Sequence, residues 1–581
     1  MRKTISIVFL ISLFFMGNAT PAINELPDQL QVAKKVDQFF ADDGNVVSPG
    51  CALGVIRSGE LVYSRGYGFA SLEHRVAIDP QRTVFDIGST SKQFTAAAIL
   101  LLISEGKLGL DDDLRAHLPE MPDYGRKINI RDLLHHTSGL RDYTVLMTMG
   151  TGVHEVDYRS AEDAIALITR QKALNFMPGT HFMYSNTNYF LLARIVERVS
   201  GKPFSQFMQE RIFVPLGMEN TRVATHYDSV VPHLASAYKR AASGGFALFM
   251  TNWEHIGESR VLSTVADLVK WDRNFYTPKI GGTWLIDQMQ VKGKRSDGVV
   301  LGYAGGLFVD RFGGHEAVSH AGNTAGYSAE VFRLPTKKFT VVLLCNNNNE
   351  QVSNLARKVA HLYLGDQLNF APSAALTSAP MGANPQARLT HFAGTFVERY
   401  NQSVRQVEEK DGKLWYVRNE RSRSALASLG GDQFQVVGST NKLHFSPSGG
   451  QMRFVSLEGE PAEFEKVKVP TAETTAGDIV DFAGTYVSEE IGTTWTIFAR
   501  DGALVVRPVR SPEIPMTLLF VDGFRAGTEL LRFSRNSTGR ITGFSADNIR
   551  VLGLRFQKLE TADTNLTTRR KSSARLRKNR S

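Results

Sequence analysis

Apolar residues cover every face of the segment from Phe94 to Ile103, which contains no charged side chain. A helix that is hydrophobic all round is buried, so this pattern predicts a helix through the middle of its domain. Ser89 and Lys92 precede it with the i, i+3 spacing that places two side chains on one helical face. A paired hydroxyl and amine at the start of a buried helix suit a nucleophile, because a helix N-terminus favours developing negative charge.

Strand-like apolar runs lie on both sides of this predicted helix. They cover residues 50–56, 61–67, 306–310, 317–320, 327–334 and 339–345. Helical patterns fill the middle of the chain, including an amphipathic segment over 190–199 that ends before Gly201. Strands at both ends and helices between them predict one α/β (α+β) domain, with an antiparallel sheet closed by the two ends of the domain.

An internal repeat occupies the last third of the chain. Phe392-Ala-Gly-Thr-Phe-Val397 recurs 90 residues later as Phe482-Ala-Gly-Thr-Tyr-Val487. Asp411-Gly-Lys-Leu414 recurs at the same offset as Asp501-Gly-Ala-Leu504. The strand-like, turn-rich pattern of each copy predicts two tandem small all-β domains, most simply barrels of the lipocalin-like kind.

Composition and charge complete the predicted domain order. The parts are a signal peptide (1–22), an α/β domain (23–366), a linker rich in Ala, Pro and Ser (367–386), two β-barrels (387–470 and 476–560) and a basic tail (561–581). The tail carries seven basic residues against one acidic residue, which accounts for +6 of the formal charge of +9. The body is therefore near neutral, and we expect no nucleic-acid partner. A solvated tail, or weak electrostatic contact of the tail with anionic wall or lipid, are the two interpretations of the basic run.

The first residues have the pattern of an export signal. Arg2 and Lys3 precede a short apolar run, and small residues follow through Ala19 and Ala22. We therefore expect an exported protein, periplasmic or secreted, although an uncleaved tether fits the same pattern. Cys51 and Cys345 are the two cysteines of the chain, and we expect two buried thiols because both lie in strand-like runs.

Two further motifs follow the Ser89-x-x-Lys92 motif in the chain. Tyr184-Ser-Asn186 precedes an amphipathic helix, and His320-Ala-Gly322 ends a predicted strand, just before Asn323. In this order the three motifs resemble those of the serine β-lactamase and penicillin-binding-protein superfamily, in its class-C-like branch. Residues 131–140 and 215–220 also resemble that branch, and the two repeat domains are similar to the layout of the D-aminopeptidases.

The resemblance implies a role for each motif residue. Ser89 would attack an acyl carbon, and either Lys92 or Tyr184 would remove its proton. The backbone N–H groups of Ser89 and Asn323 would form an oxyanion hole, at ~3–4 kcal/mol per donor. Asn186 would orient the amide groups of the substrate, and Gly322 would also be a substrate-binding residue. No cofactor is expected.

His320 departs from the usual motif, in which a lysine meets a substrate carboxylate. A histidine is mostly neutral at pH 7, which favours amides or esters without that anion. We expect no metal at His320, because the chain offers no clustered ligands, and His135 and His136 are better explained as structural or solvated histidines. The D-aminopeptidase layout further implies that a loop of the second barrel reaches the cleft. The proline-rich segment 507–516 is the predicted loop, and Glu513 in it could meet a substrate amino group, although an exposed surface loop is an equal alternative.

These observations predict an exported serine hydrolase that acts through an acyl-enzyme on amides or esters. Its substrate would be a small molecule or a peptide, with D-amino-acid peptides or cell-wall fragments as candidates. A carboxylesterase, a β-lactamase or a DD-peptidase of the same fold is the alternative. A penicillin-binding-like sensor or scaffold that binds wall fragments without turnover is the alternative of a different class. The sequence leaves the substrate and the oligomeric state open.

Overall fold

The computed structural model describes most of the chain in two units. The described residues are 26–40, 47–152, 156–349, 351–370, 385–398, 403–419, 422–437, 439, 441–455, 462–468 and 479–560. Helix α1 (Leu26–Gln38) belongs to the first unit, and the second unit begins at Val46. The predicted signal peptide and basic tail, and most of the predicted linker, lie outside the described residues. Within the described part, no helix combines the length and the apolarity needed to cross a membrane.

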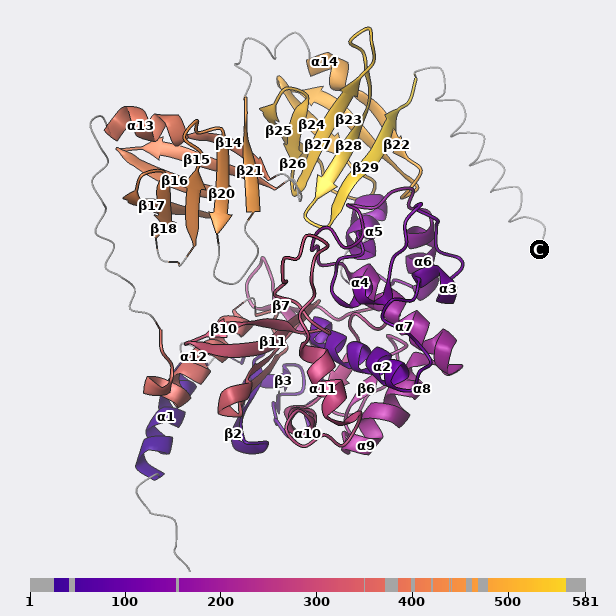
Figure 1. Ribbon diagram of the computed structural model, residues 1–581, viewed down its shortest axis with the longest axis vertical. Coiled ribbons are helices and arrows are strands. Elements are labelled where there is room, and N and C mark those ends of the chain that lie inside the picture. Colours follow the sequence, from indigo (N-terminus) through magenta and orange to yellow (C-terminus); the bar gives the residue numbers. More distant parts are fainter. Residues whose placement is uncertain are drawn as a thin grey trace, which may run out of the picture. The chain divides into compact units, whose positions relative to one another are not determined.

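The α/β domain is built on one six-stranded antiparallel sheet (Figure 1). Its strand order is β10-β11-β12-β13-β1-β2. The strands are β1 (Cys51–Arg57), β2 (Glu60–Tyr67), β10 (Phe308–Phe312), β11 (His315–Thr324), β12 (Tyr327–Leu334) and β13 (Phe339–Cys345). The early hairpin thus pairs with the end of the late meander, which confirms the predicted sheet closed by both ends of the domain. Every residue of β12 and β13 is buried, so both faces of the sheet are covered.

Helices and short strands fill the region between the two halves of this sheet. The helices are α2 (Lys92–Ser104), α3 (Leu114–His117), α4 (Ile130–Leu134), α5 (Tyr143–Thr151), α6 (Ala161–Thr169), α7 (Asn186–Ser200), α8 (Phe204–Met208), α9 (Val214–Leu216), α10 (Val265–Asn274) and α11 (Gly282–Gln290), followed after β13 by α12 (Val352–Leu364). The short strands are β3 (Phe69–Ser71), β4 (Val76–Ala77), β5 (Phe85–Asp86), β6 (Arg222–Val223), β7 (Tyr238–Arg240), β8 (Phe246–Leu248) and β9 (Val261–Ser263). Helices α10 and α12 pack on the sheet, and α2 packs against α7 and α11.

Helix α2 is the predicted buried helix. All of its residues from Lys92 to Leu102 are buried, and it ends at Ser104 with Gly106 at a φ of +68° just beyond. A left-handed glycine after the last turn is the usual end of a helix. A 3₁₀ turn over Gly88–Ser91 leads into it, and Ser89 is the one residue between Thr83 and Leu102 that is not buried. Ser89 therefore presents an accessible hydroxyl at the start of a helix that is buried from Lys92 to Leu102.

Polar side chains at the start of α2 are buried but hydrogen-bonded. Thr90 Oγ1 donates to the His320 carbonyl (3.0 Å), and Thr95 Oγ1 donates to the Gly257 carbonyl (2.6 Å). Gln93 accepts from the Trp271 indole N–H at 2.6 Å. A buried polar group costs little only when it finds such partners. These bonds fix the helix start against β11 and against the loop before β9.

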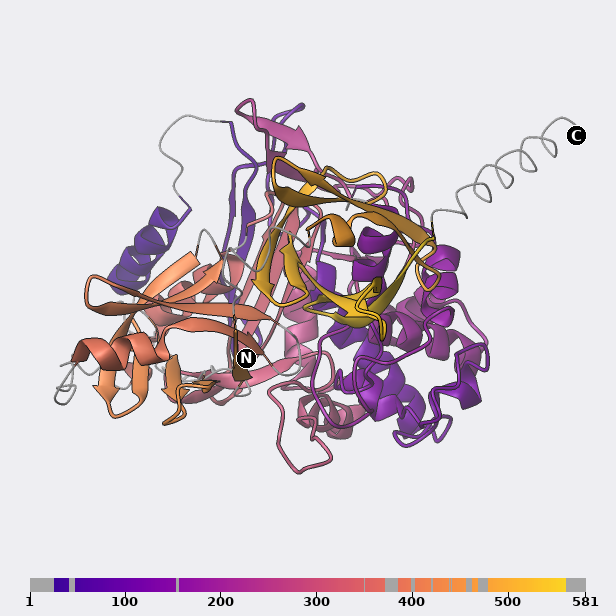
Figure 2. The same cartoon turned by 90° about the horizontal axis from the view of Figure 1, so that it is seen from above.

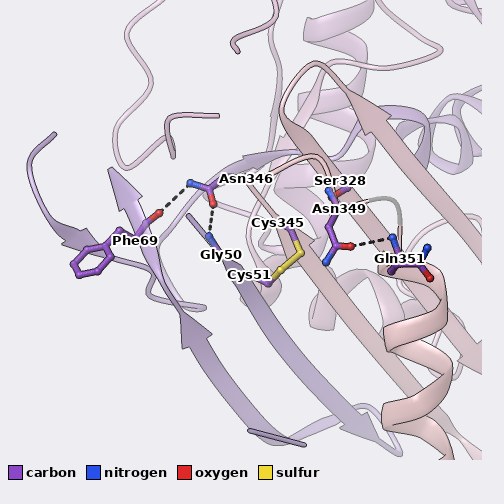
Figure 3. Close-up of a disulfide and its surroundings, with 8 residues drawn as sticks. All are labelled: Gly50, Cys51, Phe69, Ser328, Cys345, Asn346, Asn349 and Gln351. Atoms are coloured by element: carbon purple, nitrogen blue, oxygen red, sulfur yellow. Dashed lines mark hydrogen bonds between the residues drawn. A yellow bond between two sulfur atoms is a disulfide. The ribbon is translucent and has the colours of Figure 1, made fainter. Parts of the chain in front are cut away.

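Cys51 and Cys345 form a disulfide, so the expectation of two buried thiols is wrong (Figure 3). The two residues face each other in the register of the neighbouring strands β1 and β13, with Cα atoms 4.0 Å apart. The bond links positions 294 residues apart in the chain. Next to it, the Asn346 side chain accepts from the Gly50 N–H and donates to the Phe69 carbonyl. The closure of the sheet is therefore reinforced at one end by a covalent bond and by a side-chain bridge.

Each repeat forms a closed eight-stranded barrel, as predicted (Figure 2). In both barrels each strand pairs with the next one in sequence, and the last strand pairs with the first. Helix α13 (Pro385–Phe392) precedes the first barrel, whose strands are β14 (Gly394–Glu398), β15 (Val404–Lys410), β16 (Lys413–Asn419), β17 (Ser422–Gly430), β18 (Gln433–Val436), β19 (Lys442–Phe445), β20 (Gln451–Val455) and β21 (Ala462–Val467). Helix α14 (Ile479–Phe482) precedes the second, with β22 (Gly484–Ser488), β23 (Thr493–Arg500), β24 (Ala503–Arg507), β25 (Ile514–Phe520), β26 (Gly523–Ala526), β27 (Glu529–Arg535), β28 (Ile541–Asn548) and β29 (Val551–Lys558). The interiors are filled with aromatic side chains, so both barrels are packed cores.

We predict that replacing both Cys51 and Cys345 with Ala lowers the free energy of unfolding by about 2–4 kcal/mol, because a cross-link over a long loop restricts the unfolded chain. Urea unfolding with and without a reductant measures the effect. The reductant should destabilise the wild type and leave the double variant unchanged. A wild-type unfolding midpoint that does not respond to complete reduction would contradict the prediction.

Candidate active site

A cavity of about 500 Å³ opens at the start of helix α2. It brings together residues from the 3₁₀ turn, the start of α7, strand β11, the loop before β9 and the second barrel. Its lining residues are Ser89, Thr144, Tyr184, Asn186, Trp253, Glu258, Ser259, Phe308, His320, Ala321, Asn323 and Arg550. Residues of all three predicted motifs therefore meet in one cavity, together with residues that the sequence analysis did not single out.

The amine of Lys92 lies below Ser89 with three oxygen atoms around it. Nζ is 3.0 Å from Ser89 Oγ, 2.9 Å from Asn186 Oδ1 and 2.8 Å from the carbonyl oxygen of Glu258. The Asn186 and Glu258 oxygens can only accept hydrogen bonds in this arrangement. A neutral amine that donates to both directs its lone pair toward Ser89 Oγ. The geometry therefore suits removal of a proton from the serine hydroxyl.

Burial lowers the pKa of Lys92 from 10.5 to about 7. The carboxylate of Glu258 opposes this shift, and the positive charge of Arg550 adds to it. A charged group that loses its water is destabilised, so a lysine at such a position gives up its proton at neutral pH. A general base is most effective when its pKa lies near the working pH.

Tyr184 lies on the other side of the serine. Its ring centroid is 4.9 Å from Lys92 Nζ, and its hydroxyl is hydrogen-bonded to Ser89. Burial raises the pKa of the Tyr184 phenol far above its usual value, despite the opposing hydrogen bond from Ser89. The phenol is therefore neutral at pH 7, where it can relay a proton but is a poor initial base.

His136 supports Tyr184 from behind. The two rings are 4.4 Å apart, and the buried His136 Nδ1 lies 3.2 Å from the Ser185 N–H and 3.0 Å from Asn188 Nδ2. The structural interpretation of His136 agrees with these contacts. Within the described residues, no three His, Cys, Asp or Glu side chains are grouped as a metal site.

His320 is a buried neutral wall of the cavity. Its Nδ1 donates to the Ala321 carbonyl at 2.6 Å, and its Nε2 lies 3.1 Å from the Tyr303 hydroxyl. Burial, with a smaller effect of Lys92, lowers the pKa of His320 to about 3. The imidazole therefore carries no charge at pH 7, as the sequence analysis expected for this position.

Two glycines allow the backbones of the 3₁₀ turn and β11 to approach each other. A Cβ at Gly322 would lie 1.9 Å from the Ile87 carbonyl oxygen and 2.9 Å from Ser89 N. Gly88, at a φ of +51°, faces Asn323 N in the same way, at 2.8 Å from its ideal Cβ. The two N–H groups of the predicted oxyanion hole, on Ser89 and Asn323, thus belong to backbone segments that only glycine lets come together.

Glu258 is a site residue that none of the three sequence motifs contains. Its Oε1 accepts from the Tyr143 hydroxyl and lies the same 2.5 Å from His255 Nδ1. Although burial opposes ionisation, His255, Tyr143 and Lys92 together lower the pKa of Glu258. Its Oε2 is buried and has no hydrogen-bond partner among the described residues. A residue of the cavity wall therefore has one carboxylate oxygen that no described residue hydrogen-bonds.

The predicted loop 507–516 does not line the cavity. Glu513 forms ion pairs with Arg500 (2.6 Å) and Arg507 (2.5 Å) of its own barrel. The loop packs on the end of α5 instead, where a Cβ at Gly152 would lie 2.4 Å from the Val509 carbonyl oxygen. The expectation that Glu513 meets a substrate amino group at the cleft is therefore wrong in this structure, because local cation partners hold its carboxylate elsewhere.

A different turn of the second barrel reaches the cavity. Arg550, between β28 and β29, lies with its guanidinium carbon 4.8 Å from the centre of the Tyr184 ring. Its Nη1 is 3.6 Å from Asp142 Oδ2. No sequence signal distinguishes this turn from the other short turns of the barrels. The D-aminopeptidase likeness implied a barrel loop at the cleft but gave the wrong loop.

The sheet, the buried helix and the Ser-Lys-Tyr cluster define a hydrolase of the β-lactamase fold. Residues 34–364 match the family described as Beta-lactamase, and the chain belongs to this family. It is 25% identical over 544 residues to a D-aminopeptidase of Brucella canis, which covers 89% of this chain and 96% of that protein. A D-aminopeptidase of Brucella anthropi is 28% identical over 317 residues, 55% of this chain and 59% of that one. The octameric penicillin-binding protein homologue from Pyrococcus abyssi shares the fold, with a TM-score of 0.52 and 21% identity, over 76% of this chain and 100% of that chain.

We predict that Gly322→Ala reduces kcat by roughly 10²–10³-fold, the effect of losing an oxyanion-hole donor. The added methyl group would separate β11 from the Ser89 turn. Gly302→Ala is the control, because a Cβ there meets no atom within 4 Å. Steady-state rates with a short-chain ester, and unfolding curves to confirm folding, provide the measurement. Equal rates in the two variants would contradict the role of Gly322.

We also predict that kcat/KM for a neutral ester rises with pH to a plateau, with a midpoint near 7, because only the neutral Lys92 amine accepts a proton. Glu258 stabilises the charged amine, so Glu258→Gln should move the midpoint to lower pH. The pH profiles of wild type and variant test both statements. A rate that falls between pH 6 and 8, or a midpoint that moves upward in Glu258→Gln, would contradict them.

Proposed function

We propose that the protein is a serine hydrolase that works through an acyl-enzyme and cleaves amides or esters with a D-aminopeptidase-like preference. The observation that carries the proposal is the Lys92 amine, buried with its pKa lowered to about 7 and 3.0 Å from Ser89 Oγ. Lys92 removes the proton of Ser89 as the hydroxyl attacks the acyl carbon. Tyr184 relays the proton to the leaving group, and the N–H groups of Ser89 and Asn323 stabilise the oxyanion.

Glu258 supports the aminopeptidase preference in place of Glu513. A cleaved residue with a free amino terminus brings an ammonium group into the cavity. Glu258 lines the cavity, its neighbours lower the pKa of its carboxyl group, and one carboxylate oxygen has no hydrogen-bond partner among the described residues. An ammonium group would donate to this second oxygen, and a buried polar atom without a hydrogen-bond partner is costly. The identity to the Brucella D-aminopeptidases supports the same preference.

The rival function is binding without turnover, as in a sensor or scaffold that keeps the cleft. Both functions predict an adduct on Ser89, but only the enzyme releases it. A carboxylesterase or β-lactamase would share the mechanism and differ in substrate. Rates with D-amino-acid amides, their L forms, short-chain esters and a chromogenic cephalosporin separate these alternatives.

The proposal includes export to an oxidising compartment, periplasmic or extracellular. The signal-like N-terminus supports it, and so does the Cys51–Cys345 disulfide, because disulfides persist in such compartments. The basic tail would then contact anionic wall or lipid weakly, with an affinity that falls as salt rises.

We predict that Ser89→Ala and Lys92→Ala each lower kcat/KM by at least roughly 10⁴-fold, because nucleophile and base act as a unit. Tyr184→Phe should lose no more than Lys92→Ala. Intact-protein mass spectrometry after an activated acyl donor should show an adduct in the wild type that disappears with time, and none in Ser89→Ala. Appreciable turnover by Ser89→Ala would refute the mechanism, and a permanent wild-type adduct would favour the sensor.

A further inference from the structure

The cavity contains one permanent positive charge, and it comes from the second barrel. Of the described residues that line the cavity, Arg550 is the one Lys or Arg. His320 is neutral, and the Lys92 amine lies beneath Ser89 as the candidate base. An anionic group of a substrate in this cavity would therefore have Arg550 as its cationic partner.

The turn that carries Arg550 is fixed to the catalytic domain by its backbone. The Arg550 carbonyl accepts from the Asp142 N–H at 3.2 Å and from Asn175 Nδ2 at 3.0 Å. Asn175 Oδ1 accepts from the Leu552 N–H at 2.7 Å. Arg141 donates to the Leu552 and Gly553 carbonyls, both at 3.0 Å. The position of Arg550 is thus set by several directed bonds that do not involve its side chain.

The Arg550 side chain retains capacity to bind a ligand. Its nearest acid is Asp142, at 3.6 Å, which is a long distance for a hydrogen-bonded pair. Asp142 is buried and already accepts from the N–H groups of Thr144 and Asn186. The guanidinium has five donors in a planar fork that matches a carboxylate, and the Arg550 side chain is 36% exposed.

We propose that Arg550 recognises a carboxylate of the substrate, so that the preferred substrates are short peptides or acyl compounds with a free carboxylate near the scissile bond. This rests on the proposed hydrolase function and extends it to substrate class. It also revises the expectation, drawn from His320, that the site favours substrates without that anion. Arg550 of the second barrel provides the positive charge that the third motif lacks, because His320 is neutral.

Two pairs of esters test the proposal because they place the charge on either side of the scissile bond. The acyl pair is 4-nitrophenyl hydrogen glutarate and 4-nitrophenyl pentanoate. The leaving-group pair is 4-acetoxybenzoate and 4-acetoxybenzamide. In at least one pair the wild type should prefer the anion by about 10- to 100-fold in kcat/KM, the range of a charge-assisted hydrogen bond. Arg550→Gln should abolish that preference, and Arg550→Lys should keep part of it.

Arg555→Gln is the matched control. Arg555 follows in β29 of the same barrel, is exposed and is not among the residues that line the cavity, so its loss changes the net charge equally. Its ester preference should equal that of the wild type. If Arg550 only packs on Tyr184, Arg550→Gln will slow both members of each pair alike, which overturns the proposal. Equal wild-type rates within both pairs also overturn it and leave the hydrolase function intact, whereas no turnover of any ester by the wild type overturns both.

Discussion

Removal of the Lys92 amine from water is the constraint on which the rest of the site depends. A solvated lysine would be a cation at pH 7 and could not accept a proton from Ser89. The chain meets this constraint by starting at Lys92 a helix that is buried as far as Leu102, and by offering its amine two fixed acceptors, Asn186 Oδ1 and the Glu258 carbonyl. Both acceptors are uncharged, so they orient the amine without strongly stabilising its charged form. The buried polar side chains at the start of α2 are tied to neighbouring backbone or side chains for the same reason: the helix start must not shift.

The second barrel also contributes to the site, through Arg550. It is held against the α/β domain by contacts that include a buried ion pair. Arg141 Nη1 lies 2.7 Å from Glu490 Oε2, and both side chains are almost completely buried. Leaving one partner of such a pair unpaired typically costs about 3–5 kcal/mol. The Trp495 indole adds a hydrogen bond to the Met149 carbonyl at 3.1 Å, in helix α5. These contacts bind the second barrel to Arg141 and to helix α5 of the α/β domain.

Local patterns sufficed for much of the fold and for the centre of the site. Strand periodicity and the repeat gave the sheet and both barrels, and short spacings gave Ser89 and Lys92. Features that depend on long-range register were missed. The pairing of Cys51 with Cys345 follows from the register of β1 against β13, which neither run contains by itself. Stiffness from proline marked 507–516 as the protruding loop, but the orientation of the barrel is set by Arg141 and Glu490, so another turn faces the cavity.

A cation at this site can be placed at position 320, as a lysine, or in the second barrel, as Arg550. The two placements have different consequences for the protonation of Lys92. A lysine at position 320 would be buried in the cavity wall, since His320 is only 2% exposed, and it would lose most of its hydration. Two ammonium groups in the same low-dielectric region would destabilise each other, and one of the two would lose its proton. Arg550 avoids this conflict because its side chain is more than a third exposed and cannot lose its proton. Its positive charge still lowers the pKa of Lys92. A cation held at the cavity by another domain can therefore attract an anion and favour the neutral base at the same time, while the wall at His320 stays uncharged.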